Sequence, residues 1–189
     1  MGVTVNYFKH EKAIVGADAK IGDKTRIWAF TNVQDGALIG SQCNICDGCY
    51  VEKGSSIGNR VTIKNNVAIF AGIKIEDEVF VGANITFIND RHPRCPNDGV
   101  WSLEDTIIRK GATLGAGSTI MCGLEIGEYA FIGAGSVVTK NVPPYTIWYG
   151  NPARQKGYAC RCGKMLDEQL KCTCGKNYRK SGQGLALNE

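Results

Sequence analysis

Residues 21–75 read IGDKTRIWAFTNVQDGALIGSQCNICDGCYVEKGSSIGNRVTIKNNVAIFAGIKI, and every sixth residue, counted from Ile21, is isoleucine or valine. The period continues on both sides, so that an Ile, Val or Leu opens eighteen six-residue blocks. These residues form two runs: Val15, Ile21, Ile27, Val33, Ile39, Ile45, Val51, Ile57, Ile63, Ile69, Ile75 and Val81, then Ile108, Leu114, Ile120, Ile126, Ile132 and Val138. A six-residue period is typical of a solenoid whose short strands turn a corner after each block, with three strands to a coil. The sequence therefore predicts an all-β fold, a parallel β-helix of about six coils around a triangular core.

The residues between the aliphatic positions fit the same prism. Gly and Asn recur where the chain must bend, as at Gly22, Asn59 and Gly115, because these residues tolerate a positive φ. A small or β-branched residue occupies the second inward position of nearly every block, as at Thr25, Ala37 and Ser118. Cys43 and Cys49 fall on that position, so we interpret them as small buried side chains rather than reactive thiols.

Composition restricts the class of protein. The 189 residues can bury a sizeable core, and no segment approaches the roughly eighteen apolar residues of a membrane span. The N-terminus lacks the apolar stretch of a signal peptide, so we expect a cytoplasmic protein. From Arg154 onward, eight Lys or Arg residues face three acidic ones, which gives this tail a charge of +5. No nucleic-acid reader motif accompanies the charge, so neither a nucleic-acid nor a membrane partner is expected; a solvated tail and a nearby phosphate-bearing cofactor both remain open.

The six-residue period breaks once, and residues 87–107 are expected to form a loop that leaves the prism. Pro93 and Pro96 lack the N–H that a central strand must donate, and Asn97-Asp98-Gly99 is a turn signal. Charged side chains gather in this loop beside Trp101. Because loops on a rigid scaffold concentrate function, a binding site is favoured over a plain surface loop.

At this point the chain resembles a known family. The repeat, the single loop and the segment IGAGSVVTKNVPPYTIWYGNPARQ (residues 132–155) resemble the left-handed parallel β-helix acyltransferases over residues 15–155. The segments RIWAFTNVQDGALIG (26–40) and VFVGANITFINDRHPR (79–94) are similar to bacterial nucleotide-amino-sugar N-acetyltransferases. The resemblance implies transfer of acetyl from acetyl-CoA to the 3-amino group of a UDP- or dTDP-linked sugar for surface polysaccharide. It also implies a homotrimer with active sites in the clefts between neighbouring prisms.

On the substrate side, the resemblance points to the coil before the loop and to the start of the loop. Asn84 matches the asparagine of the family pattern VGxNxxFxND and could hydrogen-bond the sugar, or simply tolerate a corner. Asp90 could take the proton of the amine. His92 is the residue type most suited to a base near neutral pH, but similar sequences carry tyrosine here, so it is either a base or a positioning residue. The candidate catalytic residues are Asn84, Asp90 and His92; the candidate substrate-binding residues are Asn84, Asn89, Asp90, Arg91 and Arg94, the arginines for a carboxylate or the diphosphate.

On the cofactor side, residues 115–118 and 133–136 both read Gly-Ala-Gly-Ser. Small side chains let a pantetheine arm lie close to the backbone, although they would equally suit tight corners. Trp148 is expected to cap the prism rather than to stack on adenine. The candidate cofactor-binding residues are Ala116, Ser118, Ala134, Lys140 and Arg154, the last two for the CoA phosphates.

The tail carries two Cys-x-Cys-Gly pairs, with thiols at Cys160, Cys162, Cys172 and Cys174. Four thiolates can hold tetrahedral Zn²⁺, and the glycines permit the necessary turns. The spacing of one residue within each pair is shorter than in common zinc knuckles, so free reduced thiols are the alternative to a structural zinc. The predicted organisation is a lead-in over 1–14, the acyltransferase domain over 15–155 and the basic tail over 156–189.

Two other classes of protein share this architecture. A carbonic-anhydrase-like enzyme needs three histidines on zinc, and this chain has only His10 and His92. A non-catalytic β-helix scaffold remains open, because a fold alone does not specify activity. An O-acetyltransferase acting on a sugar hydroxyl is also open, and a dominant basic role for His92 would point to it.

Overall fold

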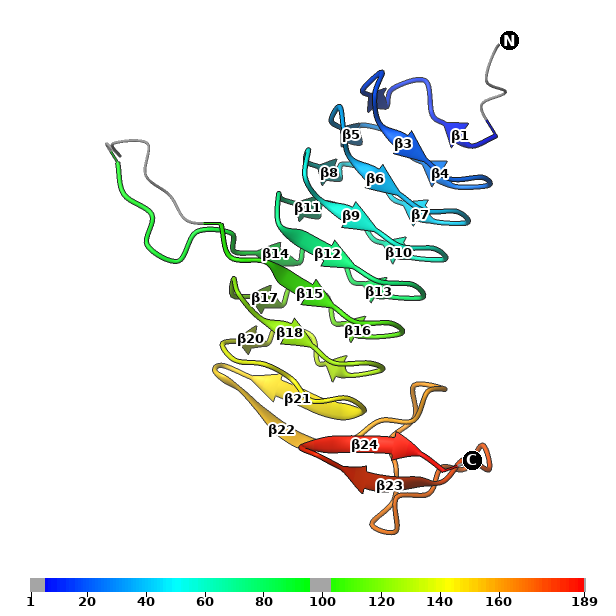
Figure 1. The fold of residues 1–189 in the computed structure, drawn as a ribbon, viewed down its shortest axis with the longest axis vertical. Helices are drawn as coiled ribbons and strands as arrows, with labels where there is room; N and C mark the ends of the chain where they lie inside the picture. The colour runs from blue at the N-terminus through cyan, green and yellow to red at the C-terminus, as the bar shows by residue number, and fades with distance from the viewer. Residues whose placement is uncertain (1–5, 96–102, 189) are drawn as a thin grey trace.

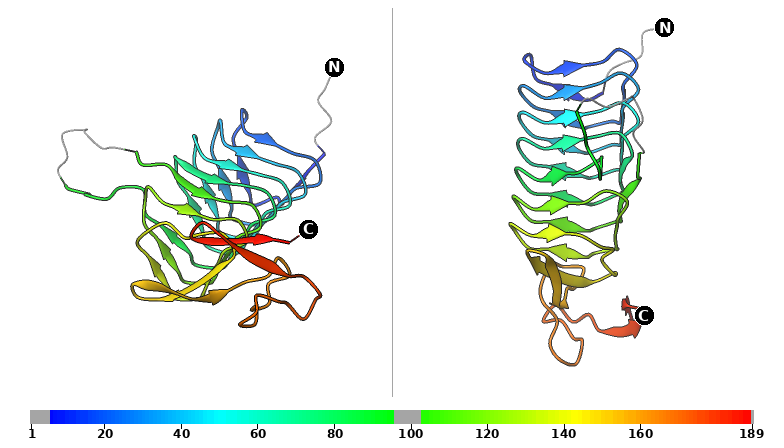
Figure 2. Two further views of the ribbon diagram at one scale, coloured as in Figure 1. Left: turned by 60° about the horizontal axis from the view of Figure 1, so that its bottom comes forward. Right: turned by 90° about the vertical axis from the view of Figure 1, so that its left-hand side faces the viewer.

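The computed structural model describes residues 6–95 and 103–188, and every regular element among them is a β-strand. Short parallel strands stack into a triangular β-helix, from which one loop projects near the middle (Figures 1 and 2). The prediction of an all-β parallel helix is confirmed. None of these residues forms a helix long and apolar enough to span a membrane.

The strands form three faces. The first face holds β1 (Phe8–Lys9), β4 (Arg26–Ile27), β7 (Asn44–Ile45), β10 (Thr62–Ile63), β13 (Phe80–Val81), β16 (Thr113–Leu114), β19 (Phe131–Ile132), β21 (Thr146–Gly150) and β22 (Ala153–Tyr158). The second face holds β2 (Ile14–Val15), β5 (Asn32–Val33), β8 (Tyr50–Val51) and β11 (Ala68–Ile69), continued by β14 (Thr86–Phe87), β17 (Thr119–Ile120) and β20 (Val137–Val138). The third face holds β3 (Lys20–Ile21), β6 (Leu38–Ile39), β9 (Ser56–Ile57), β12 (Ile73–Ile75), β15 (Thr106–Ile108) and β18 (Glu125–Ile126).

Pairing between coils follows the period seen in the sequence. Ile45 in β7 pairs with Ile27 in β4 and with Ile63 in β10, each eighteen residues away. Across the loop, Val81 in β13 pairs with Leu114 in β16, thirty-three residues away. The loop thus adds fifteen residues between two coils, and the same aliphatic positions point inward on both sides of it. The aliphatic column is completely buried over most of its length, which is the main source of stability in this fold.

Two cysteines take part in this core as expected. Cys43 and Cys49 are each 1% exposed, and their sulfur atoms contact the carbonyl oxygens of Gly58 and Lys64 at 3.1 and 3.2 Å. Burial raises the pKa of the Cys49 thiol to about 11 and also raises the pKa of Cys43. The raised pKa values keep both thiols protonated near neutral pH, and the prediction that they are small buried side chains is confirmed.

The helix is longer than predicted, with about seven turns instead of six. β1 pairs in parallel with β4, so a strand already occurs inside the expected lead-in. The period misses it because Lys9 stands where an aliphatic residue is required. Phe8 instead packs on Trp28, with ring centroids 5.3 Å apart.

The loop is also shorter than predicted. Phe87 is 2% exposed in β14 and fills an inward position with an aromatic ring, which hid it from a search for Ile, Val and Leu. β15 begins at Thr106, so the loop covers residues 88–105 rather than 87–107. The predicted turn at 97–99, together with Pro96 and Trp101, lies outside the described residues.

The C-terminal region covers the last coil. β21 continues the first face parallel to β19, and β22 turns back antiparallel to β21. Trp148 is 6% exposed and belongs to the prism core, which confirms the predicted cap. The hairpin of β23 (Tyr178–Ser181) and β24 (Gly184–Leu187) follows, and Figure 1 shows it at the end of the prism opposite the N-terminus. A second small core joins the two parts, formed by Tyr145, Cys160, Leu166, Cys172, Tyr178 and Leu185.

Candidate active site

Most of the predicted substrate and cofactor residues lie at the two corners that border one part of the second face, formed by β14, β17 and β20. The chain enters this face through one corner of the prism and leaves it through the next. We call the entry corner the asparagine edge, because it includes Asn84, and the exit corner the loop edge, because residues 88–105 leave from it.

At the asparagine edge, successive coils present the same backbone conformation. Asn84, Gly117 and Gly135 have φ values of +56°, +67° and +68°. The Gly117 N–H donates to the Ala83 carbonyl, and the Gly135 N–H donates to the Ala116 carbonyl, both at 2.9 Å. The corner of Asn84 therefore lies directly beside the corner that carries Ala116, and the corner that carries Ala134 follows one coil farther on. One predicted catalytic residue and two predicted cofactor residues thus lie in a row along this edge.

The side chain of Asn84 is exposed at this edge. Its Oδ1 atom accepts a hydrogen bond from Asn66 Nδ2 at 3.2 Å, one coil away. Among the described residues, only this atom of the Asn84 side chain has a hydrogen-bond partner. Its amide N–H groups thus face solvent as donors, which suits them to an oxygen atom of a substrate or of a thioester.

Some small residues of the two Gly-Ala-Gly-Ser segments face solvent, and others are buried in the prism. A Cβ atom at Gly117 or Gly135 would meet no other atom within 4 Å, so the backbone is accessible at both corners. Ser118 is instead completely buried, and its hydroxyl donates to the Gly115 carbonyl at 2.8 Å. We therefore keep Ala116 and Ala134 in the candidate cofactor surface and place Ser118 inside the prism.

At the loop edge, an ion pair holds the two legs of the loop together. Arg91 donates to both carboxylate oxygens of Glu104, at 3.0 and 2.8 Å, and to the Cys122 carbonyl at 2.8 Å. The hydrogen bond from Arg91 lowers the pKa of Glu104. The stability that the ion pair contributes is therefore fully present above the ordinary pKa of a carboxylate. It is lost as the pH falls through the lowered pKa of Glu104. Arg91, predicted to bind substrate, thus donates hydrogen bonds to Glu104 and Cys122 in this structure.

The remaining predicted residues of the loop lie just beyond β14. The partly buried Asp90 accepts a hydrogen bond from the His92 backbone N–H on its Oδ1 atom, at 2.9 Å. This short turn leaves Oδ2 available to a ligand. His92 and Arg94 are exposed, and Arg94 donates to the Pro93 carbonyl at 2.8 Å; Asn89 is partly buried.

Replacing Gly123 with alanine is expected to loosen the base of the loop. Gly123 has φ +72°, and an added Cβ would overlap the Glu104 carboxylate and lie 3.3 Å from Arg91 Nη2. Gly117→Ala is the matched control, because Gly117 has nearly the same φ but open space where the Cβ would lie. Limited trypsin proteolysis should cut within the loop faster in Gly123→Ala than in Gly117→Ala. Equal cutting rates would show that the Arg91–Glu104 pair does not hold the loop.

A cationic pocket of about 410 Å³ lies farther along the prism, beside the corner that follows β20. Lys140 and Arg154 both line it, so the structure brings together the two cations predicted for the CoA phosphates. Trp148 forms part of the wall, with Lys140 Nζ 5.2 Å from its ring centroid. Gln183, from the turn between β23 and β24, also lines this pocket and was not predicted from the sequence.

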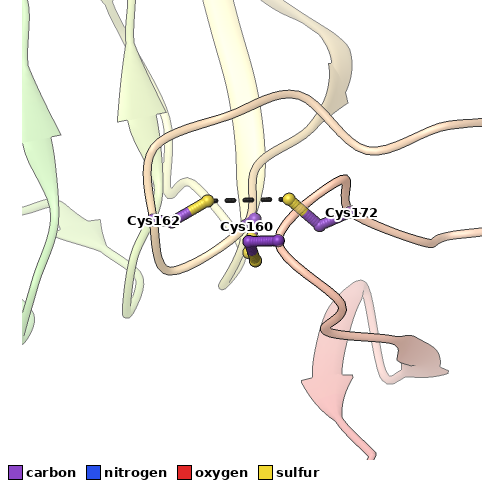
Figure 3. A group of neighbouring side chains, drawn as sticks. Cys160, Cys162 and Cys172 are labelled. Carbon is purple, nitrogen blue, oxygen red and sulfur yellow. Dashed lines mark hydrogen bonds between the residues drawn. The ribbon is translucent and has the colours of Figure 1, made fainter.

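The four tail cysteines form a compact cluster. Figure 3 labels three of them and shows the sulfur atoms of Cys162 and Cys172 facing each other. All four sulfur atoms lie within 4.8 Å of each other, and two pairs, Cys160 with Cys174 and Cys162 with Cys172, are 3.5 Å apart. Tetrahedral zinc with Zn–S bonds of about 2.3 Å places its sulfur atoms about 3.8 Å apart. The Tyr178 hydroxyl donates to Cys160 Sγ at 3.1 Å, as outer partners of metal-bound thiolates do. The cluster can therefore bind a metal ion.

The backbone around the cluster repeats the same turn twice. The Gly163 N–H donates to the Cys160 carbonyl at 2.8 Å, and the Gly175 N–H donates to the Cys172 carbonyl at 2.9 Å. Both glycines have a positive φ, of +86° and +91°. These turns explain how pairs separated by a single residue can still direct two thiols to one point.

Asn84 and Asp90 flank β14 (Thr86–Phe87), one in the corner before this strand and the other at the start of the loop after it. The sequence reasoning also missed Glu104, the partner of Arg91. No signal in a single sequence pairs two loop residues thirteen positions apart, since the period is interrupted there.

Comparison with known proteins identifies the family. Residues 105–140 match the family described as bacterial transferase hexapeptide (six repeats), and residues 33–71 match the hexapeptide repeat of succinyl-transferase. A dTDP-3-amino-3,6-dideoxy-alpha-D-galactopyranose 3-N-acetyltransferase of Aneurinibacillus thermoaerophilus is 50% identical over 175 residues, which cover 91% of this chain and 90% of that protein. The chain belongs to the hexapeptide-repeat acetyltransferases.

Solved structures of more distant acetyltransferases share the fold. A hexapeptide-repeat acetyltransferase of Vibrio cholerae in complex with acetyl coenzyme A has a TM-score of 0.56 at 24% identity, covering 74% of this chain and 70% of that one. AntD, an N-acyltransferase of Bacillus cereus in complex with dTDP and coenzyme A, has a TM-score of 0.51 at 20% identity, covering 83% of each chain. At these identities the likeness shows the fold alone.

Proposed function

We propose that this acetyltransferase transfers the acetyl group of acetyl-CoA to the 3-amino group of a dTDP-linked 3-amino-3,6-dideoxyhexose, for surface polysaccharide. The observation that carries the proposal is the 50% identity, over nearly the whole of both chains, to an enzyme named for that reaction. The exposed asparagine edge, the adjoining loop and the cationic pocket supply places for an amino sugar and for a phosphorylated cofactor. The cytoplasmic location expected from the sequence suits both acetyl-CoA and reduced thiols.

Acetyl transfer from a thioester to an amine needs only a few groups from the protein. The sugar amine attacks the thioester carbonyl, an amide bond forms and the carbon–sulfur bond breaks. The nitrogen gives up one proton, and the departing CoA sulfur takes up one proton, so CoA leaves as its thiol. We assign Asp90 to take that proton, through the carboxylate oxygen that the His92 N–H does not use. We assign the Asn84 amide to donate a hydrogen bond to the thioester oxygen or to the sugar. The rest of the rate enhancement comes from holding the two substrates together.

We further propose that the active enzyme is a homotrimer, as the family resemblance implies. The placement of Asn84 and Asp90 at different corners of the prism supports sites that are shared between neighbouring protomers. A site that uses both needs the asparagine edge of one protomer to face the loop edge of a neighbour. Mixing Asn84→Ala and Asp90→Asn protomers tests this arrangement. With random mixing, about a quarter of the sites regain both residues if they come from different chains, and activity returns to about that fraction. Mixed trimers as inactive as the parents would place both residues in a site within one chain.

We propose that the cysteine cluster holds a structural zinc ion. Four thiolates leave zinc no open position for water or substrate, so this metal would order the tail and take no part in acetyl transfer. The nearby Lys164, Lys171 and Lys176 would offset the net negative charge of a four-thiolate centre.

Thermal denaturation with added ligands tests the proposed substrates. Ligands that bind the native protein stabilise it, by about 2.7 kcal/mol at a concentration one hundred times the dissociation constant. We expect acetyl-CoA and the dTDP-linked amino sugar each to raise the melting temperature, and the UDP-linked counterpart to raise it less. An equal or larger shift with the UDP-linked sugar would overturn the assignment of the nucleotide.

A further inference from the structure

The hairpin of β23 and β24 is held rigidly against the end of the prism. The Leu185 N–H donates to the Pro144 carbonyl at 3.2 Å, and a Cβ atom at Gly184 would overlap that same carbonyl. Leu185 and Tyr178 are 3% and 4% exposed and pack in the second core together with Cys160. Backbone contact on one side and the cysteine core on the other therefore fix the position of the turn at residues 181–184.

This turn forms a wall of the cationic pocket. Gln183 lines the pocket together with Lys140, Arg154 and Trp148, and it also lines an adjoining hollow with Asn141 and Pro143. Two cations line the pocket, and no acidic residue does. Such a lining fits an anion, and a glutamine amide at its wall can add a hydrogen bond to a phosphate oxygen without adding charge.

We infer that the cysteine-stabilised tail completes the cofactor site, and that Gln183 is a cofactor-binding residue that donates to a phosphate of CoA held by Lys140 and Arg154. The inference rests on the proposed use of acetyl-CoA. The tail then both covers the last coil and places Gln183 in the cofactor pocket, because the core around the cysteine cluster sets the position of the turn that carries Gln183.

Calorimetric titration of the full-length protein with CoA and with pantetheine, which lacks the adenosine and its phosphates, tests the inference. Gln183→Ala should raise the dissociation constant for CoA about tenfold, as expected for the loss of one hydrogen bond to a charged group, and leave pantetheine unaffected. Gln183→Glu should weaken CoA binding further, because it places a negative charge beside the phosphates. Gln169→Ala is the matched control, since Gln169 is an exposed glutamine of the same tail that does not line the pocket.

Gly184→Ala tests the position of the turn separately, because the added Cβ should displace the turn without removing any group from the pocket. It should also weaken CoA more than pantetheine. If the wild-type protein binds CoA but Gln183→Ala binds it equally well, the inference about the turn is wrong and the proposed function stands. If the wild-type protein does not bind CoA at all, the proposed cofactor itself is wrong and the inference is overturned with it.

Discussion

Asp90→Asn is expected to lower kcat for acetylation of the amino sugar by about a hundredfold or more, the range for loss of a positioned general base. The substitution is conservative in structure, because the asparagine carbonyl oxygen can still accept the His92 N–H that Asp90 Oδ1 accepts at 2.9 Å. The loop turn is kept while the ability to take a proton is removed. The dissociation constant for acetyl-CoA should stay within about twofold of wild type, since Asp90 does not line the cationic pocket.

Two companion variants distinguish a base from a positioning residue. His92→Asn should cost less than about a hundredfold, because the side chain of His92 is exposed and Asp90 already supplies a base. Asn84→Ala should lower kcat and leave acetyl-CoA binding nearly unchanged. A loss of about ten-thousandfold in His92→Asn, with little change in Asp90→Asn, would make His92 the base and favour acetyl transfer to a hydroxyl.

Zinc analysis of protein purified without chelator is expected to give about one zinc per chain, as a single tetrahedral site requires. The double variant Cys162→Ser, Cys174→Ser removes one exposed thiol from each pair and should bring the zinc content close to zero. Loss of the metal should unfold the tail and lower the melting temperature of the protein, because a structural zinc site contributes directly to folding. The prism should keep its β-sheet circular dichroism, since each coil is stabilised by its neighbours.

The matched control is Cys43→Ser, Cys49→Ser, which removes two thiols from the prism core and none from the cluster. Its zinc content should equal that of wild type, although its melting temperature should fall because hydroxyl groups are buried. Two outcomes would contradict a zinc site. Intact protein without zinc, or a cluster variant that keeps it, would leave the four thiols as free or disulfide-forming groups.

Most of the fold could be predicted from the sequence, because each inward position is occupied by a residue of one kind at a fixed spacing. The prediction was wrong where another residue took that position, as Lys9 does in β1 and Phe87 does in β14. In a stacked solenoid the backbone pairing of neighbouring coils holds such a strand in place, even when its side chain breaks the pattern.

The site was harder to predict than the fold. Positions on the repeat could be assigned to coils from the period, and the structure then shows that Asn84 and Ala116 lie on one edge of the prism. Partners outside the repeat could not be placed, because loop and tail contacts depend on folding in space. For this reason neither the pairing of Arg91 with Glu104 nor the presence of Gln183 beside Lys140 in one pocket was foreseen.

Acetylation of a dTDP-linked 3-amino-3,6-dideoxyhexose, followed by nuclear magnetic resonance of the product, tests the central claim most directly. We expect one acetyl group per sugar, attached as an amide to the nitrogen at carbon 3, with one CoA thiol released per amide formed. The corresponding sugar with a hydroxyl at carbon 3 should not react. An acetyl ester on a hydroxyl group, or no acetylation of the amino sugar while acetyl-CoA binds normally, would contradict the proposed function.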